Sequence, residues 1–172
     1  KPYLQNVTPS SIHIMWETTS NDESTVQWGE TTELGYTATG DAYNSVNSHY
    51  IHDVHLTDLD QNTRYYYKVI TGGLESDIFD FVTPTASEFE SSLRVIAMSD
   101  MQKDYSNFNK FQEIINQGIF SYLDISDTLL LTDALDLVLI PGDLVDNGIN
   151  HTEWSDHFFG PSEPLFSHIP LY

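Results

Sequence analysis

The chain has 172 residues, and its six basic against 26 acidic side chains give a net charge of −20 at pH 7. This charge disfavours binding to nucleic acids and anionic membranes, because both polyanions would be repelled. A hydrophobic content of 40% is typical of a folded protein, and no apolar run approaches the ~18 residues of a membrane span. Zero cysteines exclude disulfides and thiolate metal sites.

Residues 1–86 contain short runs in which apolar and polar side chains alternate, as they do in half-buried β-strands. Turn-rich segments separate the runs, which predicts an antiparallel β-sandwich of the fibronectin type III-like kind. Leu59 followed by Tyr65 resembles the tyrosine corner of such sandwiches, where the phenol ties back to the preceding turn. The alternating positions are Ile12, Ile14, Trp16, Val26, Trp28, His52, Val54, Leu56, Tyr65, Tyr67, Val69, Phe79 and Phe81.

The pattern changes after a polar, proline-marked segment, and residues 87–92 are predicted to be a linker. Residues 93–98 and 135–140 are compact apolar runs of the buried-strand type. Strand, helix and strand predict a βαβ unit with a parallel sheet, so residues 93–172 are expected to begin an α/β domain. The intervening residues at helical spacing are Phe108, Phe111, Ile114 and Ile115, with Ser106 and Asn107 as plausible caps.

Both predicted strands of this second part end in aspartate, Asp100 and Asp143. Parallel neighbours would place the two carboxylates at one sheet edge, where they share a proton or bind cations. Gly142 is expected to permit a tight turn that a larger residue would obstruct, and Pro141 to end the ladder. The alternative is that both aspartates only cap turns.

The segments S-D-M-Q at residues 99–102 and G-D-L-V-D-N-G at residues 142–148 resemble the first two motifs of the calcineurin-like metallophosphoesterases. The β-rich part before them, opening with KPYLQNVTPSSIHIMWET, resembles the amino-terminal domain of purple acid phosphatase-like proteins. The resemblance implies that Asp100 ligates one metal ion, that Asp143 bridges two, and that Asp146 orients ligands or the loop. Two ions of Fe, Mn, Zn or Mg, roughly 3.5–4 Å apart, would clamp a phosphoryl group and activate a bound hydroxide.

The chain departs from the family pattern in three ways. Gln102 stands where the motif has histidine; if its amide oxygen ligates, this harder donor favours Mn, Mg or ferrous iron over zinc. Asp146 stands where true purple acid phosphatases have tyrosine. The chain also stops before the family's G-N-H-D/E and G-H-x-H motifs, so its catalytic side chains stay unassigned. We therefore expect the front part of an enzyme, cut inside its catalytic domain and inactive by itself.

The function implied by the resemblance is hydrolysis of phosphate mono- or diesters on a small phosphorylated substrate by a metal-dependent phosphoesterase. The resemblance, with the glycosylation sequons at Asn6 and Asn150, also favours a secreted, periplasmic or cell-surface protein. The alternative is a non-catalytic fibronectin type III-like module for binding or adhesion, followed by a degenerate phosphoesterase remnant. Gln102 is the feature that favours this alternative, and the sequence indicates no oligomeric state.

Two histidine patterns resemble metal sites, but a structural role suits each of them better. His49, His52 and His55 are spaced by three, and on a strand this spacing sends neighbours to opposite faces, so convergence is not expected. The segment Asn150–Glu153 faintly resembles the G-N-H-E motif, yet Asn150 with Glu153 fits a helix capping box more closely. Neither His157 nor His168 has a predicted role.

The aspartate at position 146 generates a first prediction. Because no tyrosinate is available there, the metal-loaded full-length enzyme is expected to lack the visible charge-transfer band of an iron–tyrosinate centre. An absorption spectrum of the iron-loaded protein measures this, and a visible charge-transfer band would contradict it.

Overall fold

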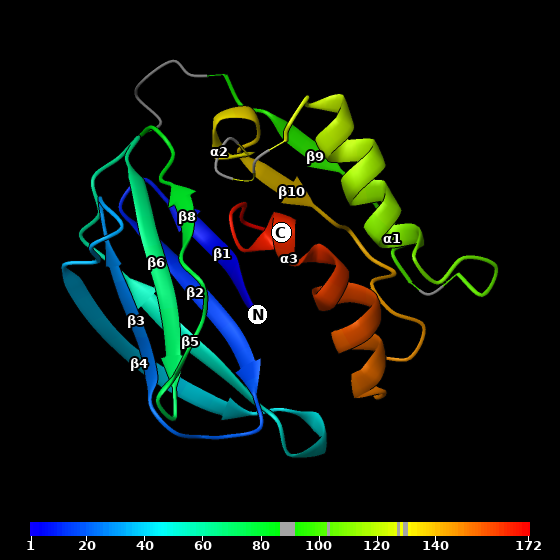
Figure 1. The fold of residues 1–172 in the computed structure, drawn as a ribbon, viewed down its shortest axis with the longest axis horizontal. Coiled ribbons are helices and arrows are strands. Elements are labelled where there is room, and N and C mark those ends of the chain that lie inside the picture. Colours follow the sequence, from blue (N-terminus) through cyan, green and yellow to red (C-terminus); the bar gives the residue numbers. More distant parts are fainter. Residues whose placement is uncertain (87–91, 103, 127, 129–130) are drawn as a thin grey trace.

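A computed structural model of the chain describes residues 1–86, 92–102, 104–126, 128 and 131–172. A β-sandwich forms the first half, as predicted, and a small parallel sheet with helices follows it (Figure 1). None of the described helices has the length and apolar character needed to span a lipid bilayer. The strands of the sandwich are β1 (Pro2–Thr8), β2 (Ser11–Thr18), β3 (Ser24–Gly29), β4 (Tyr36–Asn44), β5 (Tyr50–Leu56), β6 (Arg64–Thr71), β7 (Leu74–Glu75) and β8 (Phe79–Val82).

The strands run antiparallel in the order β1-β2-β5-β4-β3-β6-β7, and β8 pairs with β6. Strand β4 belongs to both layers, because residues 36–40 pair with β3 and residues 41–44 pair with β5. Gly40 lies where β4 changes partner, and a Cβ there would lie 2.0 Å from the Asp53 carbonyl oxygen. Only a residue without a side chain permits this close backbone approach.

The sandwich core follows the predicted alternation. Of the expected inward positions, only Trp28 is partly buried and packs at the margin of the cluster. The tyrosine corner is confirmed, since the Asp60 backbone N–H donates to the Tyr65 hydroxyl at 2.9 Å. Local period-two patterning was therefore sufficient to predict this half of the fold.

The second half contains a parallel pair of strands flanked by helices. Strands β9 (Val95–Ala97) and β10 (Leu137–Leu139) pair in parallel, as the βαβ pattern predicted. The first helical segment is α1 (Lys110–Glu113), which continues into the π-helical η2 (Ile114–Phe120). The second is the short α2 (Leu131–Ala134). The third is the π-helical η4 (Glu153–Phe159), which continues into α3 (Gly160–Phe166). Their apolar faces form a second core that includes Phe111, Ile115, Val138, Phe158 and Leu165.

Two details of this half were predicted wrongly. Residues 93–98 were expected to form a buried strand, but Leu93 is 63% exposed and Val95 is 40% exposed. The reason is that β9 lies at the edge of the parallel pair and has only β10 as its described partner. The helix begins at Lys110, which leaves Phe108 outside it and 59% exposed.

The predicted linker, residues 87–92, lies almost wholly outside the described residues, so the domain boundary stays a prediction.

Residues 170–172 connect the two halves through the backbone. They lie beside β10, where Val138 N donates to Pro170 O at 3.0 Å and Tyr172 N donates to Val138 O at 2.9 Å. On their other side, Leu171 N donates to Leu4 O of β1 at 3.0 Å. This segment therefore joins the parallel sheet to the first strand of the sandwich.

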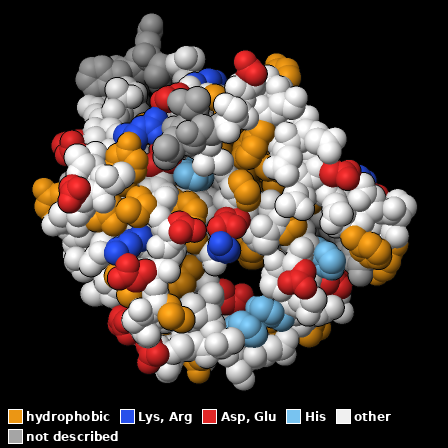
Figure 2. Space-filling view, viewed as in Figure 1, with side chains coloured by type: hydrophobic (Ala, Val, Ile, Leu, Met, Phe, Trp, Pro, Cys, Tyr) orange, Lys and Arg blue, Asp and Glu red, His pale blue; other side chains and the backbone are white. Residues whose placement is uncertain are grey.

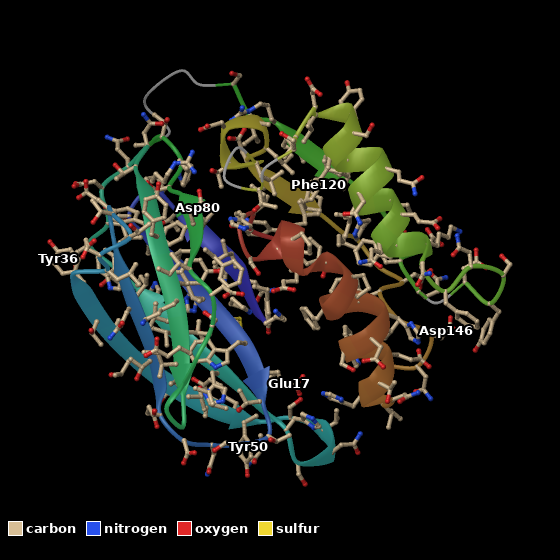
Figure 3. The ribbon with its side chains drawn as sticks, viewed as in Figure 1. Glu17, Tyr36, Tyr50, Asp80, Phe120 and Asp146 are labelled. Carbon is tan, nitrogen blue, oxygen red and sulfur yellow. The ribbon has the colours of Figure 1, made fainter. Side chains whose placement is uncertain are left out.

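A buried carboxylate lies at the centre of the same seam. Asp80 of β8 is fully buried, and its oxygens contact Arg64 of β6, His168 after α3, and the Thr132 hydroxyl of α2 at 3.1 Å (Figure 3). Burying a carboxylate is costly unless charged and hydrogen-bonding partners compensate it. Since the partners come from both halves, this network requires the halves to be packed together.

The network generates a stability prediction. Asp80→Asn is expected to lower the free energy of unfolding by about 3–5 kcal/mol, because it breaks a buried ion pair on one side. Denaturant unfolding measures the loss. Asp133→Asn is the control: Asp133 pairs with the same Arg64 at 2.7 Å but its side chain is 66% exposed, so its loss should stay below about 1 kcal/mol. Equal losses in the two variants would contradict the role assigned to Asp80.

Candidate metal centre

The register of the parallel strands brings the predicted ligands to one sheet edge. Ala97 of β9 pairs with Leu139 of β10, and Asp100 and Asp143 follow these two residues within four positions. The Gln102 backbone N–H donates to the Asp143 carbonyl at 2.9 Å, so the two loops are hydrogen-bonded to each other. The structure thus places Asp100, Gln102 and Asp143 in two adjoining loops.

Both aspartates occupy left-handed backbone conformations, with φ of 61° at Asp100 and 53° at Asp143. This region is uncommon for residues other than glycine, although aspartate tolerates it better than most. Strained backbone of this kind is frequent at functional sites, where the surrounding structure maintains it. Asp100 and Asp143 thus share a left-handed φ shortly after their strands end.

The role expected for Gly142 is wrong. A Cβ at this position would meet nothing within 4 Å among the described residues, and its φ is not positive. The sharp turn is made one residue later, by Asp143. A short loop that faces solvent leaves room for a side chain at Gly142, and the sequence alone could not distinguish the two positions.

The carboxylates at this edge are accessible. Asp100, Asp143 and Asp146 are all exposed, and Asp100 accepts a hydrogen bond from the Ser99 hydroxyl at 2.7 Å. Asp146 lies on the loop that leads from β10 toward the C-terminal helices (Figure 3). These carboxylates are open to an ion or a small substrate from solvent.

The Gln102 side chain provides a test of whether a metal ion fits. Its Oε1 atom is buried and has no hydrogen-bond partner among the described residues. An unsatisfied buried oxygen costs about 1–3 kcal/mol, and a cation would satisfy it. Two carboxylates and an amide oxygen form a hard donor set of the kind that Mg²⁺, Mn²⁺ and ferrous iron accept. The donor types present are therefore compatible with a metal ion.

Basic side chains do not provide an alternative anion site in the described part of the chain. The basic residues described there are each paired with a carboxylate: Lys1 with Glu163, Arg64 with Asp80 and Asp133, Lys68 with Glu75, Arg94 with Asp136, and Lys110 with Asp104. A phosphorylated ligand at this edge would therefore depend on bound cations for its electrostatic attraction.

The histidines of β5 do not converge, as predicted. His52 is buried, stacks on Trp16 and contacts the hydroxyls of Thr18 and Ser24, each at 2.8 Å. Burial lowers the pKa of His52, so it is a neutral core residue at physiological pH. His55 points outward and stacks on His13. His49 precedes the strand and stacks instead on His151, a contact that sequence spacing could not reveal.

The capping role expected for Asn150 is supported by its contacts. Its side-chain oxygen accepts the Thr152 N–H at 3.2 Å, and its amide donates to Glu153 at 3.4 Å. The Glu153 carboxylate reaches further back, to the Asn147 N–H at 2.8 Å. The segment therefore starts a helix, although His151 within it points to a different contact.

With this geometry in place, the chain was compared with known proteins. Residues 2–83 match the family model of the purple acid phosphatase N-terminal domain. The match covers a little under half of the chain, and no curated protein sequence matched it.

Two solved structures resemble nearly the whole chain. Purple acid phosphatase PPD1 from yellow lupin seeds matches with a TM-score of 0.69 at 23% identity, covering 99% of this chain and 34% of that one. PhoD matches with a TM-score of 0.63 at 12% identity, covering 99% of this chain and 37% of that one. Identities this low show the fold alone, and the chain spans about a third of each structure.

The orphaned oxygen of Gln102 leads to a prediction on metal choice. Gln102→His is expected to raise the affinity for Zn²⁺ relative to Mg²⁺ at least tenfold, because imidazole suits zinc better than an amide oxygen does. Competition between the two ions, followed by elemental analysis of the full-length protein, measures the shift.

A control separates ligation from packing. Gln102→Leu should not lower the free energy of unfolding of the metal-free protein, because the buried oxygen it removes has no described partner. A large loss of stability in this variant, with no change in metal preference in the histidine variant, would contradict a ligand role.

Proposed function

We propose that this chain is the amino-terminal part of a metal-dependent phosphoesterase that hydrolyses phosphate mono- or diesters. The observation that carries the proposal is the register of β9 and β10, which brings Asp100, Gln102 and Asp143 to one edge. The family match of residues 2–83 and the fold shared with PPD1 and PhoD support it. The activity is assigned to a longer protein, since this chain spans about a third of those structures.

The residues at the edge have separate tasks in this proposal. Asp143 would be the carboxylate shared by two metal ions, Asp100 would hold one of them, and Gln102 would add a neutral oxygen. When bound, the ions supply Lewis-acid stabilisation of phosphoryl charge and lower the pKa of a water nucleophile. Asp146 orients the loop from its exposed position. The ions are two of Fe, Mn, Zn or Mg, with an oxygen-rich donor set favouring the harder ones.

The surroundings suit a small substrate. In this part of the protein the carboxylates are exposed to solvent. The net charge of −20 repels a free phosphate ester, and metal ions at the edge reverse the local sign. We also place the protein outside the cytoplasm, in the secreted, periplasmic or cell-surface compartment.

A second candidate is a non-catalytic binding or adhesion module. The glutamine at position 102 and the exposure of β9 favour it, because both are compatible with a phosphoesterase unit that has lost its site. The two candidates differ in whether the Asp143 carboxylate supports turnover.

The test is hydrolysis of p-nitrophenyl phosphate and its bis ester by the full-length protein, loaded in turn with Mn, Fe, Zn and Mg. Asp143→Asn is expected to lower kcat at least 100-fold, because it removes the charge that holds both ions. Metal content of the purified variant should fall in parallel.

Asp124→Asn is the matched control. Asp124 is also an exposed aspartate with a left-handed backbone, at φ 55°, but it follows η2 and not a strand of the parallel sheet. The phosphatase activity of the Asp124→Asn variant should equal that of the unmodified protein. Absence of turnover with all four metals would favour the binding module. Equal turnover in Asp143→Asn would contradict the role proposed for Asp143.

A further inference from the structure

A second group of ligand-type side chains meets across the seam between the two halves. Glu17 comes from β2, His49 directly follows η1 (Val46–Ser48), and His151 opens the helix that leads into η4. One ligand atom from each lies within 4.8 Å of the others. The group contains none of the residues assigned to the proposed phosphoesterase site. Figure 3 shows Glu17 at the end of β2, facing the gap toward the C-terminal helices.

The glutamate is only partly satisfied. Its Oε2 atom lies 3.1 Å from His151 Nε2, while Oε1 is buried and has no hydrogen-bond partner among the described residues. A carboxylate only accepts, so His151 Nε2 carries the hydrogen of this contact, and an ion bound between the two atoms would replace that proton. The Glu17 carboxylate therefore has one oxygen close to a ring nitrogen of His151 and a second oxygen without a partner among the described residues.

The first histidine is oriented as metal-ligating histidines usually are. His49 Nδ1 lies 3.0 Å from the Asn47 carbonyl oxygen, which can only accept, so Nδ1 carries the hydrogen and Nε2 keeps the lone pair. Histidine ligands commonly donate their second N–H to a backbone carbonyl in this way, which fixes the tautomer and the ring.

The two imidazole rings are close enough to share an ion after a small rearrangement. Their centroids are 3.6 Å apart and their planes differ by 18°, so they are stacked. A metal must lie in the plane of each ring, so one ring has to turn about its Cβ–Cγ bond. A hollow of about 320 Å³, lined also by Tyr3, Thr18 and Ser155, provides the space.

The local charge also permits a cation. Lys1 is the basic residue that lines this hollow, and its Nζ is paired with Glu163 at 2.6 Å. Figure 2 shows histidine and acidic side chains gathered at the margin of a hollow on this face. The Lys1 side-chain ammonium is therefore engaged by Glu163, while the Lys1 α-ammonium interacts electrostatically with Glu17.

We propose that Glu17, His49 and His151 form a site for a zinc-class transition-metal ion, with a fourth position open to water, that fastens the sandwich to the α/β half. Two imidazoles and one carboxylate suit Zn²⁺ and its neighbours in the first transition series, and do not suit Mg²⁺. The donor set thus differs from the all-oxygen set of Asp100, Gln102 and Asp143. Because Glu17 and His151 belong to different halves, binding stabilises their contact.

The test is calorimetric titration of the chain with Zn²⁺ at pH 7.5, with Mg²⁺ in excess to occupy the oxygen site. One zinc ion per chain should bind, and at about 100 times its Kd it should raise the melting temperature by roughly 5 °C. Glu17→Gln and His151→Ala should each weaken zinc binding at least tenfold. Asp143→Asn should leave it unchanged, which separates this site from the proposed phosphoesterase site.

His157→Ala is the matched control, because it removes an imidazole from the same helical segment but not from the cluster. It should bind zinc as the unmodified chain does. Circular dichroism of every variant in EDTA establishes that it is folded. Zinc binding that is absent, or equally strong in folded Glu17→Gln and His49→Ala, would overturn the proposal.

Discussion

The seam between the two halves depends on the complete burial of the Asp80 carboxylate. A charge in that position is tolerated only because Arg64, Thr132 and His168 surround it, and two of these three come from the α/β half. Nearby, the Tyr67 hydroxyl donates to the Ser167 carbonyl at 2.7 Å in a buried contact. Separating the halves would remove the Thr132 and His168 contacts of Asp80 and the Ser167 contact of Tyr67, so the sandwich is packed as a fixed support against the α/β half.

This packing also has consequences for the candidate metal centre. His168 is held by Asp80, and residues 170–172 follow it immediately and lie against β10. Ile140 N donates to Tyr172 O at 2.7 Å, so residues 170–172 lie alongside the chain as far as Ile140, the residue before Pro141. The loop that carries Asp143 is therefore connected to the buried charge through these hydrogen bonds and the short stretch of chain from His168 to Tyr172. A matching fold across PPD1 and PhoD is consistent with such a shared arrangement.

A feature of the fold was predictable from the sequence when the residues that form it lie close together along the chain or follow a regular pattern. Alternation reports local burial, so the sandwich core and the tyrosine corner were predictable from neighbouring residues. The ends of two parallel strands meet by geometry, so Asp100 and Asp143 could be brought together in advance. Asp80 could not, because alternation with Phe79 and Phe81 directs it outward, where only the second half of the chain covers it. The contact of Glu17 with His151 spans 134 residues and has no periodic signature.

The excess of acidic over basic residues leaves many carboxylates without a basic partner. In the described part of the chain, basic side chains are used in ion pairs, and Arg64 in particular is held at the seam. Remaining carboxylates are then free to hold cations, and the structure offers two donor sets of different chemistry. One is built from oxygen and lies at the solvent-facing edge of the parallel sheet; the other contains two imidazoles and lies between the halves. Because hard and borderline ions prefer different donors, the two sets are expected to differ in the metals that they would bind.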